Sequence, residues 1–176
     1  MTNSLPLAHS YNLARLGNAG DQVVITADDD QRAAIARWSG IASLEALQAR
    51  IEIKKLAFDR FALTFHLTAE LTQSCVVTLE PVKSSLERGF TRELHFTAPV
   101  RHKQASDDSV PELVLDGEEE GPEEIENLNY DLAGPLLEEF VLSLEPYPRC
   151  RGVEFAPQTD RPEQPESPFA VLKGLK

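Results

Sequence analysis

Side chains alternate in character through the middle of the chain, along residues 61–72. One set is apolar: Phe61, Leu63, Phe65, Leu67, Ala69 and Leu71. The residues between them are small or polar: Ala62, Thr64, His66, Thr68, Glu70 and Thr72. A period of two places the first set on one face of an extended strand and the second on the other. The alternation therefore predicts a long, half-buried strand, which needs partner strands of the same kind.

Shorter segments on both sides supply the partner strands. They are rich in β-branched or alternating apolar residues, and proline ends two of them. They comprise residues 22–27, a strand that begins at Ile51, residues 75–79 before Pro81, and residues 90–96 before Pro99. Ser43 starts either a short helix or the next strand. These segments predict an antiparallel β-meander with one solvated face.

Two helices are expected to accompany this sheet. Asp28 to Asp30 can cap a helix over residues 31–38, and Gly40 ends it. A second, amphipathic helix spans residues 131–145, where apolar residues recur at every fourth position and Pro135 falls in the first turn. We expect this helix to pack on the open face of the sheet, with partner binding as the alternative. The predicted fold class is α+β.

The net charge of −12 comes from one stretch. No Lys or Arg occurs from Gln104 to Pro148, a stretch that includes Glu118, Glu119, Glu120, Glu123 and Glu124. Residues 100–129 also contain Gly and Pro and few apolar residues, so we expect an acidic mobile loop. Such a segment suits a basic protein partner, and these five glutamates are the candidate contacts.

The domain organisation follows from these patterns. Residues 1–156 are expected to form a single domain that carries the acidic loop. Residues 157–176 read as a Pro/Glu-rich linker followed by a C-terminal motif. The chain contains no apolar run near the roughly 20 residues of a membrane helix, and its first residues do not resemble a secretory signal, so we expect no membrane association.

The sequence offers no catalytic constellation. Nucleophile-elbow, phosphate-loop and zinc-protease motifs are absent, and the four histidines stand apart from one another. We therefore expect no enzymatic activity, no cofactor and no metal. Lys54 and Lys55, and separately Arg149 and Arg151, form small basic spots that are candidates for contact with RNA or a partner, or are ordinary surface charge.

Three stretches, taken in order, resemble one family. They are Thr72–Val82, residues 131–149 with the ending Pro146-Tyr147-Pro148-Arg149, and the C-terminal motif with Pro168, Phe169, Leu172 and Leu175. With an acidic loop between the first two, they look like the YceD-like family of large ribosomal RNA subunit accumulation proteins, and most like its alphaproteobacterial members.

The resemblance implies a cytoplasmic ribosome-biogenesis factor without known enzymatic activity. Combined with the acidic loop, it leads us to expect a large-subunit ribosomal protein or assembly factor as partner, while any contact with the 23S ribosomal RNA precursor falls to the basic spots. A small enzyme and a structural adapter without RNA contact are the alternatives. Many relatives carry Cys-x-x-Cys where this chain has Cys75 to Thr78, and a second Cys cluster where it has Cys150 to Val153. The incomplete pairs imply that any metal site of the family is lost here, because tetrahedral zinc needs about four N or S ligands.

Overall fold

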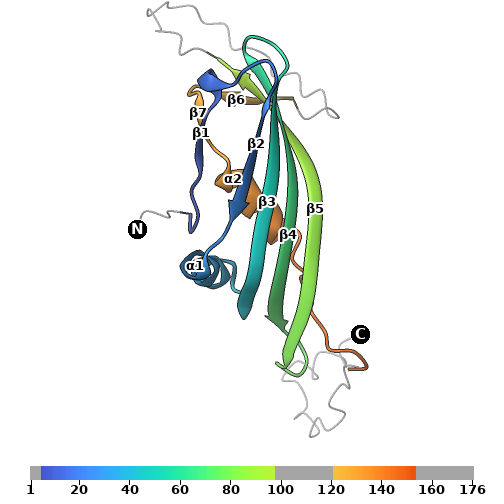
Figure 1. Cartoon of the computed structure of the whole chain (residues 1–176). Coiled ribbons are helices and arrows are strands. Elements are labelled where there is room, and N and C mark those ends of the chain that lie inside the picture. Colours follow the sequence, from blue (N-terminus) through green and yellow to red (C-terminus); the bar gives the residue numbers. More distant parts are fainter. Residues whose placement is uncertain (1–4, 98–120, 154–176) are drawn as a thin grey trace, which may run out of the picture.

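The structure, a computed structural model, describes residues 5–97 and 121–153. Within these ranges the fold is α+β, which confirms the predicted class. A five-stranded sheet has the order β2-β3-β4-β5-β6, and β1 pairs with β7 in a small second sheet (Figure 1). In chain order the elements are β1 Ser10–Asn12, the 3-10 helix η1 Leu13–Arg15, β2 Asp21–Thr26, α1 Asp29–Ser39, β3 Ser43–Lys55, β4 Arg60–Ser74, β5 Pro81–Phe96, β6 Glu123–Ile125, β7 Asn129–Asp131 and α2 Ala133–Leu142.

The predicted meander is confirmed, because β2, β3, β4 and β5 pair antiparallel in sequence order. The apolar residues of β4 that set the alternation are all buried, whereas the residues between them face the other side of the sheet. Phe65 on β4 lies opposite Phe90 on β5, and their rings stack with centroids 4.5 Å apart. The period of two therefore sorts side chains between an inner and an outer face, as the sequence indicates.

The strand boundaries after β4 differ from the prediction. Residues 75–79 were expected to form a strand ending at Pro81; instead they form the β4–β5 turn, and β5 begins at Pro81. Proline is tolerated as the first residue of a strand, where its missing N–H does not interrupt the ladder. Ser43 starts β3 rather than a helix, and a register shift between Leu44 and Ala46 adapts its first residues to β4.

The predicted loop over residues 100–129 is too long at its C-terminal end. Residues 123–125 form β6, which pairs parallel with β5 through Leu94 and Glu123. Ile125 and Tyr130 are buried, and this apolar burial anchors β6 and β7 against the body of the fold. The rest of the predicted loop, up to residue 120, lies outside the described residues, as does the predicted linker from residue 157.

Helix α1 has the predicted cap residues at both ends, Asp28 and Gly40, but it begins at Asp29, two residues before the predicted start at residue 31. Asp28 accepts a hydrogen bond from the Gln31 amide at 2.8 Å, and the Gln31 side chain accepts one from the Asp28 amide at 2.9 Å. This capping box satisfies two N–H groups that otherwise lack helical partners. Gly40 ends the helix at a φ of 74°, a left-handed conformation that glycine adopts without strain.

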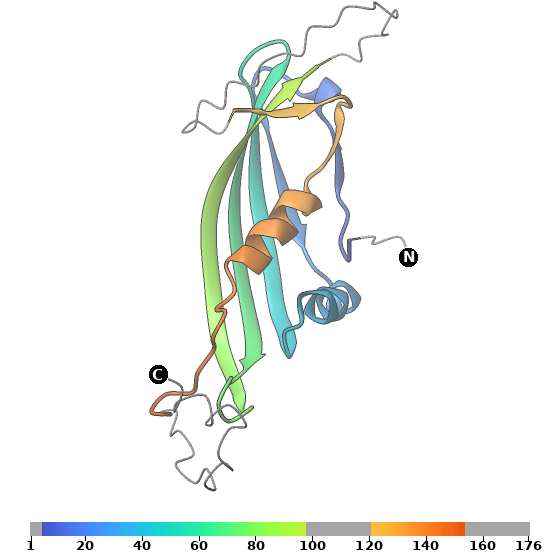
Figure 2. The same cartoon turned by 180° about the vertical axis from the view of Figure 1, so that it is seen from behind.

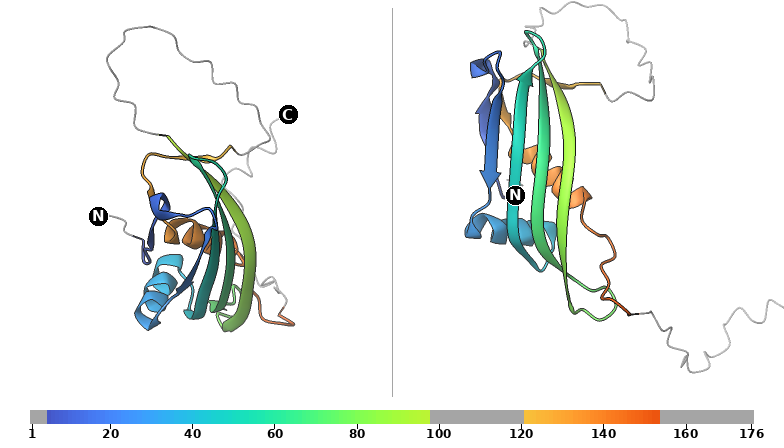
Figure 3. Two further views of the ribbon diagram at one scale, coloured as in Figure 1. Left: turned by 45° about the horizontal axis from the view of Figure 1, so that its top comes forward. Right: turned by 45° about the vertical axis from the view of Figure 1, so that its right-hand side comes forward.

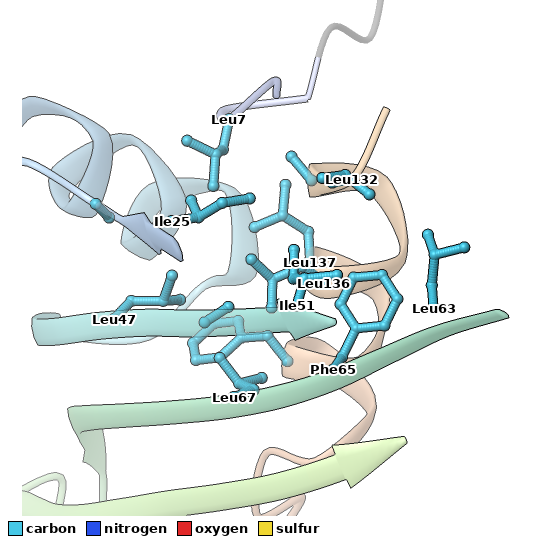
Figure 4. Packing of buried hydrophobic residues seen from close by; sticks show 14 of the residues in the cluster. Leu7, Ile25, Leu47, Ile51, Leu63, Phe65, Leu67, Leu132, Leu136 and Leu137 are labelled. Atoms are coloured by element: carbon cyan, nitrogen blue, oxygen red, sulfur yellow. The ribbon is translucent and has the colours of Figure 1, made fainter. Parts of the chain in front are cut away.

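Helix α2 lies across the concave face of the curved sheet (Figure 2). Leu136, Leu137 and Phe140 have no exposed surface, and Figure 4 shows the first two pointing toward Ile51 and Phe65 of the sheet. The helix therefore closes the open face of the sheet, as predicted. It is shorter than the expected 131–145, because Asp131 belongs to β7 and the helical hydrogen bonds end at Ser143.

Polar contacts also fasten α2, which crosses one face of the sheet (Figure 3), to strand β5. Arg92 and Glu138 form an ion pair with an N–O distance of 2.6 Å, and Arg88 donates a hydrogen bond to the Ser143 hydroxyl at 3.2 Å. These side chains are partly exposed, so each contact contributes little energy but fixes the position of the helix. Apolar burial supplies most of the stability of the helix–sheet packing.

Phe140→Ala should lower the free energy of unfolding by about 3–5 kcal/mol, because it removes a buried ring and leaves a cavity between α2 and the sheet. Leu142→Ala, two residues further on and 73% exposed, should change it by less than about 0.5 kcal/mol. Urea unfolding followed by circular dichroism measures both variants. Equal effects of the two substitutions would contradict the packing of α2 described here.

Candidate functional site

The described candidate residues lie at opposite ends of the long sheet. Lys54 and Lys55 end β3 beside the β3–β4 hairpin, at the top in Figure 1. Glu123 and Glu124, in β6, lie at the same end, because Lys55 aligns with Phe61, Leu94 and Glu123 across successive strand pairs. Arg149 and Arg151 stand in the turn after α2, which lies beside the β4–β5 turn because the Val76 amide donates to the Pro148 carbonyl; this is the bottom end of the sheet in Figure 1. The two predicted basic spots are therefore separate surfaces.

The β3–β4 hairpin projects an exposed aromatic ring beside a lysine. We call residues 54–60 the hairpin tip. Phe58 is 89% exposed, and the Nζ atom of Lys55 lies 5.6 Å from the centre of its ring. The side chain of Asp59 contacts the His95 ring at 3.2 Å and its carbonyl accepts the Phe96 amide at 2.7 Å, so the tip is fixed to β5. An exposed ring beside cations can stack on a nucleobase.

Glu123 and Glu124 are not equivalent, although both are exposed. The Tyr130 hydroxyl donates a hydrogen bond to the Glu123 carboxylate at 3.1 Å. Burial, followed by the charge and hydrogen bond of Glu123, raises the pKa of Tyr130. Glu123 therefore holds β6 against β7, whereas Glu124 is exposed and has no such contact with Tyr130.

The remaining predicted site residues cannot be placed. Glu118, Glu119 and Glu120 lie outside the described residues, and so do Pro168, Phe169, Leu172 and Leu175 of the C-terminal motif. Their proposed contacts stay predictions.

At the other end of the sheet, two turns that are far apart in sequence face each other. One is the β4–β5 turn with Cys75 and Thr78, and the other contains Cys150 and Gly152. The Val76 amide donates to the Pro148 carbonyl at 2.9 Å, and the Cys150 amide donates to the Cys75 sulfur at 3.4 Å. The sequence does not indicate this meeting, because it depends on the path of the chain after α2.

The two thiols have different surroundings. Hydrogen bonds from the Thr78 hydroxyl and from the backbone amides of Cys150 and Thr78 lower the pKa of Cys75 to about 6. Thr78 also lowers the pKa of Cys150, but loss of solvent together with the hydrogen bond and charge of Cys75 outweighs that effect and raises it. Cys75 is therefore the thiol that ionises first.

This donor set falls short of a structural zinc site. The first and fourth positions of the two facing turns hold Cys75, Thr78, Cys150 and Val153. Two thiols, one hydroxyl and one apolar side chain do not give the four N or S ligands of tetrahedral zinc. Among the residues that the structure describes, no group of three or more His, Cys, Asp or Glu residues could hold a metal ion.

A groove of about 580 Å³ lies between the sheet and the chain that leaves α2. Its lining includes Leu71, Leu86 and Leu144 together with Glu87 and Arg88. The sequence does not indicate this groove, because residues 81–89 lack the apolar alternation that would identify them as the first half of β5. Its mixed lining does not by itself select a ligand.

The family comparison gives one match. The model described as "Large ribosomal RNA subunit accumulation protein YceD" matches residues 63–176, more than half of the chain. No curated protein and no solved structure matches. Within the described ranges, no helix is long and apolar enough to cross a membrane.

The two tyrosines of the small sheet should make the protein sensitive to alkali. Tyr11 lies opposite Tyr130; burial and its hydrogen bond to Asp21 raise the pKa of Tyr11 to about 12. In the unfolded chain these tyrosines ionise near pH 10. Their contribution to the free energy of unfolding is therefore complete below pH 10 and is lost as the pH rises toward their higher pKa values in the folded protein. Urea unfolding from neutral pH to about pH 12 should show a falling free energy.

The control for this prediction is the double variant Tyr11→Phe/Tyr130→Phe. It should lose less stability than the wild type over the same pH range, because it has no phenol to ionise in this sheet. An alkaline decline of the same size in both proteins would refute the assignment to these two tyrosines.

The protein should fold without zinc. Plasma emission spectrometry of the purified chain should find much less than one zinc per chain, and a chelator should leave the midpoint of thermal unfolding unchanged. One bound zinc per chain, with a lower midpoint after chelation, would show that the two cysteines recruit ligands outside the described residues.

Proposed function

The chain belongs to the YceD family of large ribosomal RNA subunit accumulation proteins, and on this basis we propose that it supports the accumulation of 23S ribosomal RNA by binding rather than by catalysis. The observation that carries the binding part is the hairpin end of the sheet. Exposed cations and an exposed aromatic ring lie there at the same end as the acidic strand β6. In this proposal the protein acts in the cytoplasm on assembling large subunits.

The acidic segment is proposed to bind a basic ribosomal protein or assembly factor of the large subunit. Ribosomal proteins that bind RNA are generally cationic, so they attract a surface rich in glutamate. Glu118, Glu119 and Glu120 precede β6 in the sequence, and Glu124 is exposed on it. Glu123 has a structural role in this proposal, because its carboxylate accepts the hydrogen bond from Tyr130.

The hairpin tip is the proposed contact with the 23S RNA precursor. Lys54 and Lys55 supply charge for phosphates, and Phe58 supplies a surface on which a base can stack. The distance between the hairpin tip and the turn with Arg149 and Arg151 makes these two basic spots independent, so the second spot need not contact the same RNA segment.

A structural adapter without RNA contact is the main alternative, and a small enzyme is the other. Crosslinking in cells followed by identification of both RNA and protein partners separates the first alternative from the proposal. RNA crosslinks at residues 54–60 support the proposal, whereas protein crosslinks alone favour the adapter. An enzyme would require turnover of a substrate by the purified chain.

Replacing Glu118, Glu119, Glu120 and Glu124 with Gln should weaken capture of the basic partner and lower the 23S RNA level in cells. The fold should stay intact, because this set contains no buried residue among those described and leaves Glu123 in place. Capture by the wild type should weaken steeply as salt rises, since exposed charges are screened beyond about 8 Å at physiological ionic strength. The variant should show a shallower salt dependence.

A matched control replaces four carboxylates that are exposed elsewhere: Asp30→Asn with Glu70→Gln, Glu87→Gln and Glu93→Gln. It should keep partner capture and RNA level near those of the wild type. If both sets behave alike, total charge rather than the acidic segment determines binding. If neither set alters capture, RNA level or salt dependence, the acidic segment has no part in the function.

A further inference from the structure

The fold gathers the two cysteines of the chain into one small site at the end of the sheet. Cys75 directly follows β4, and Cys150 lies in the turn after α2. The Cys150 amide lies 3.4 Å from the Cys75 sulfur, and the Thr78 hydroxyl lies 3.8 Å from the Cys150 sulfur. Both thiols therefore have Thr78 as a neighbour, although strands β5, β6 and β7 and helix α2 lie between the two cysteines in the sequence.

We propose that Cys75 and Cys150 form a reversible disulfide, which fastens the chain after α2 to the end of the sheet. This site does not depend on the proposed role in RNA accumulation. Both cysteines are free thiols in the structure, and the hydrogen bond from one residue to the sulfur of the other sets them side by side. Bond formation then needs local adjustment of the two turns rather than a rearrangement of the sheet.

Exposure decides which thiol meets an oxidant. Cys75 has no exposed surface, whereas Cys150 is partly exposed. A small disulfide such as oxidised glutathione therefore reaches Cys150 first. Arg149 and Arg151 are exposed on either side of Cys150, and their positive charge attracts the carboxylates of glutathione.

The reaction is a pair of thiol–disulfide exchanges. The exposed Cys150 thiol loses its proton and attacks one sulfur of oxidised glutathione, and one glutathione leaves as a thiolate that takes up a proton. The Cys75 thiolate then attacks the Cys150 sulfur of the mixed disulfide, which breaks the bond to the second glutathione and forms the Cys75–Cys150 bond. Two protein thiols are oxidised, and one glutathione disulfide is reduced to two glutathione thiols.

The surroundings of Cys75 favour the second exchange. The pKa of about 6 keeps its sulfur ionised at neutral pH, and the thiolate is the nucleophile in this step. The amides and the Thr78 hydroxyl that hold the thiolate also fix it next to Cys150. Holding the reacting sulfurs together should favour disulfide closure over a lasting glutathione adduct.

The test uses the full-length protein in redox buffers of oxidised and reduced glutathione, quenched with acid and measured by mass spectrometry. The wild type should become an intramolecular disulfide, two hydrogen atoms lighter, without a lasting glutathione adduct. The effective concentration of the two thiols should exceed that in the urea-unfolded chain by at least about tenfold. The oxidised protein should also show a higher midpoint of thermal unfolding.

Variants separate the roles of the two thiols. Cys75→Ser should retain one glutathione on Cys150, Cys150→Ser should react slowly while folded, and Thr78→Val should prolong the mixed disulfide. Circular dichroism of each reduced variant checks the fold, and the wild-type redox equilibrium stands as a test if a variant unfolds. A lasting adduct in the wild type, disulfide-linked dimers, or equal effective concentrations in folded and unfolded protein would overturn the proposal.

Discussion

Burial of α2 against the concave face of the sheet is the interaction on which the rest of this structure depends. Four antiparallel strands place apolar side chains on one face. Leaving this large apolar surface in water is unfavourable, so another element must cover it. Leu136, Leu137 and Phe140 cover its centre. The chain passes through β6 and β7 at the hairpin end of the sheet before α2 crosses the concave face. This path fixes where α2 begins.

The packing of α2 also explains why the candidate functional residues lie at the ends of the sheet. The inner face of the sheet is occupied by the helix and the outer face is a regular polar surface, so unusual contacts occur at the ends of the strands. At one end Phe58 and Lys55 project from a fixed hairpin. At the other end the chain leaving α2 brings Cys150 to Cys75. The two ends are built by different segments, so they can serve different tasks.

The sequence predicts those parts of the fold in which local pattern and burial agree. The alternation of β4, the helix cap at Asp28 and the period of α2 belong to this group. The resemblance to the family is also readable from the sequence. The sequence does not predict the first half of β5, because Ser84 and Arg88 face inward there and interrupt the apolar alternation. The sequence does not predict strand β6 either, because a strand of three residues in an acidic segment is too short to show a hydrophobic period. The pairing of the two cysteines and the Tyr130 contact of Glu123 depend on tertiary contacts alone.

The two neighbours of β5 in the sheet differ greatly in length. β4 pairs with it along its whole length, but among the described residues β6 pairs only with positions 94–96, so much of its other edge has backbone groups without strand partners. Such an edge is a template for aggregation between copies of a protein. Lys83, Glu87, Arg88 and Glu93 are all exposed along it. A second sheet docking there would have to bury these charges, and this cost opposes edge-to-edge pairing between copies of the chain.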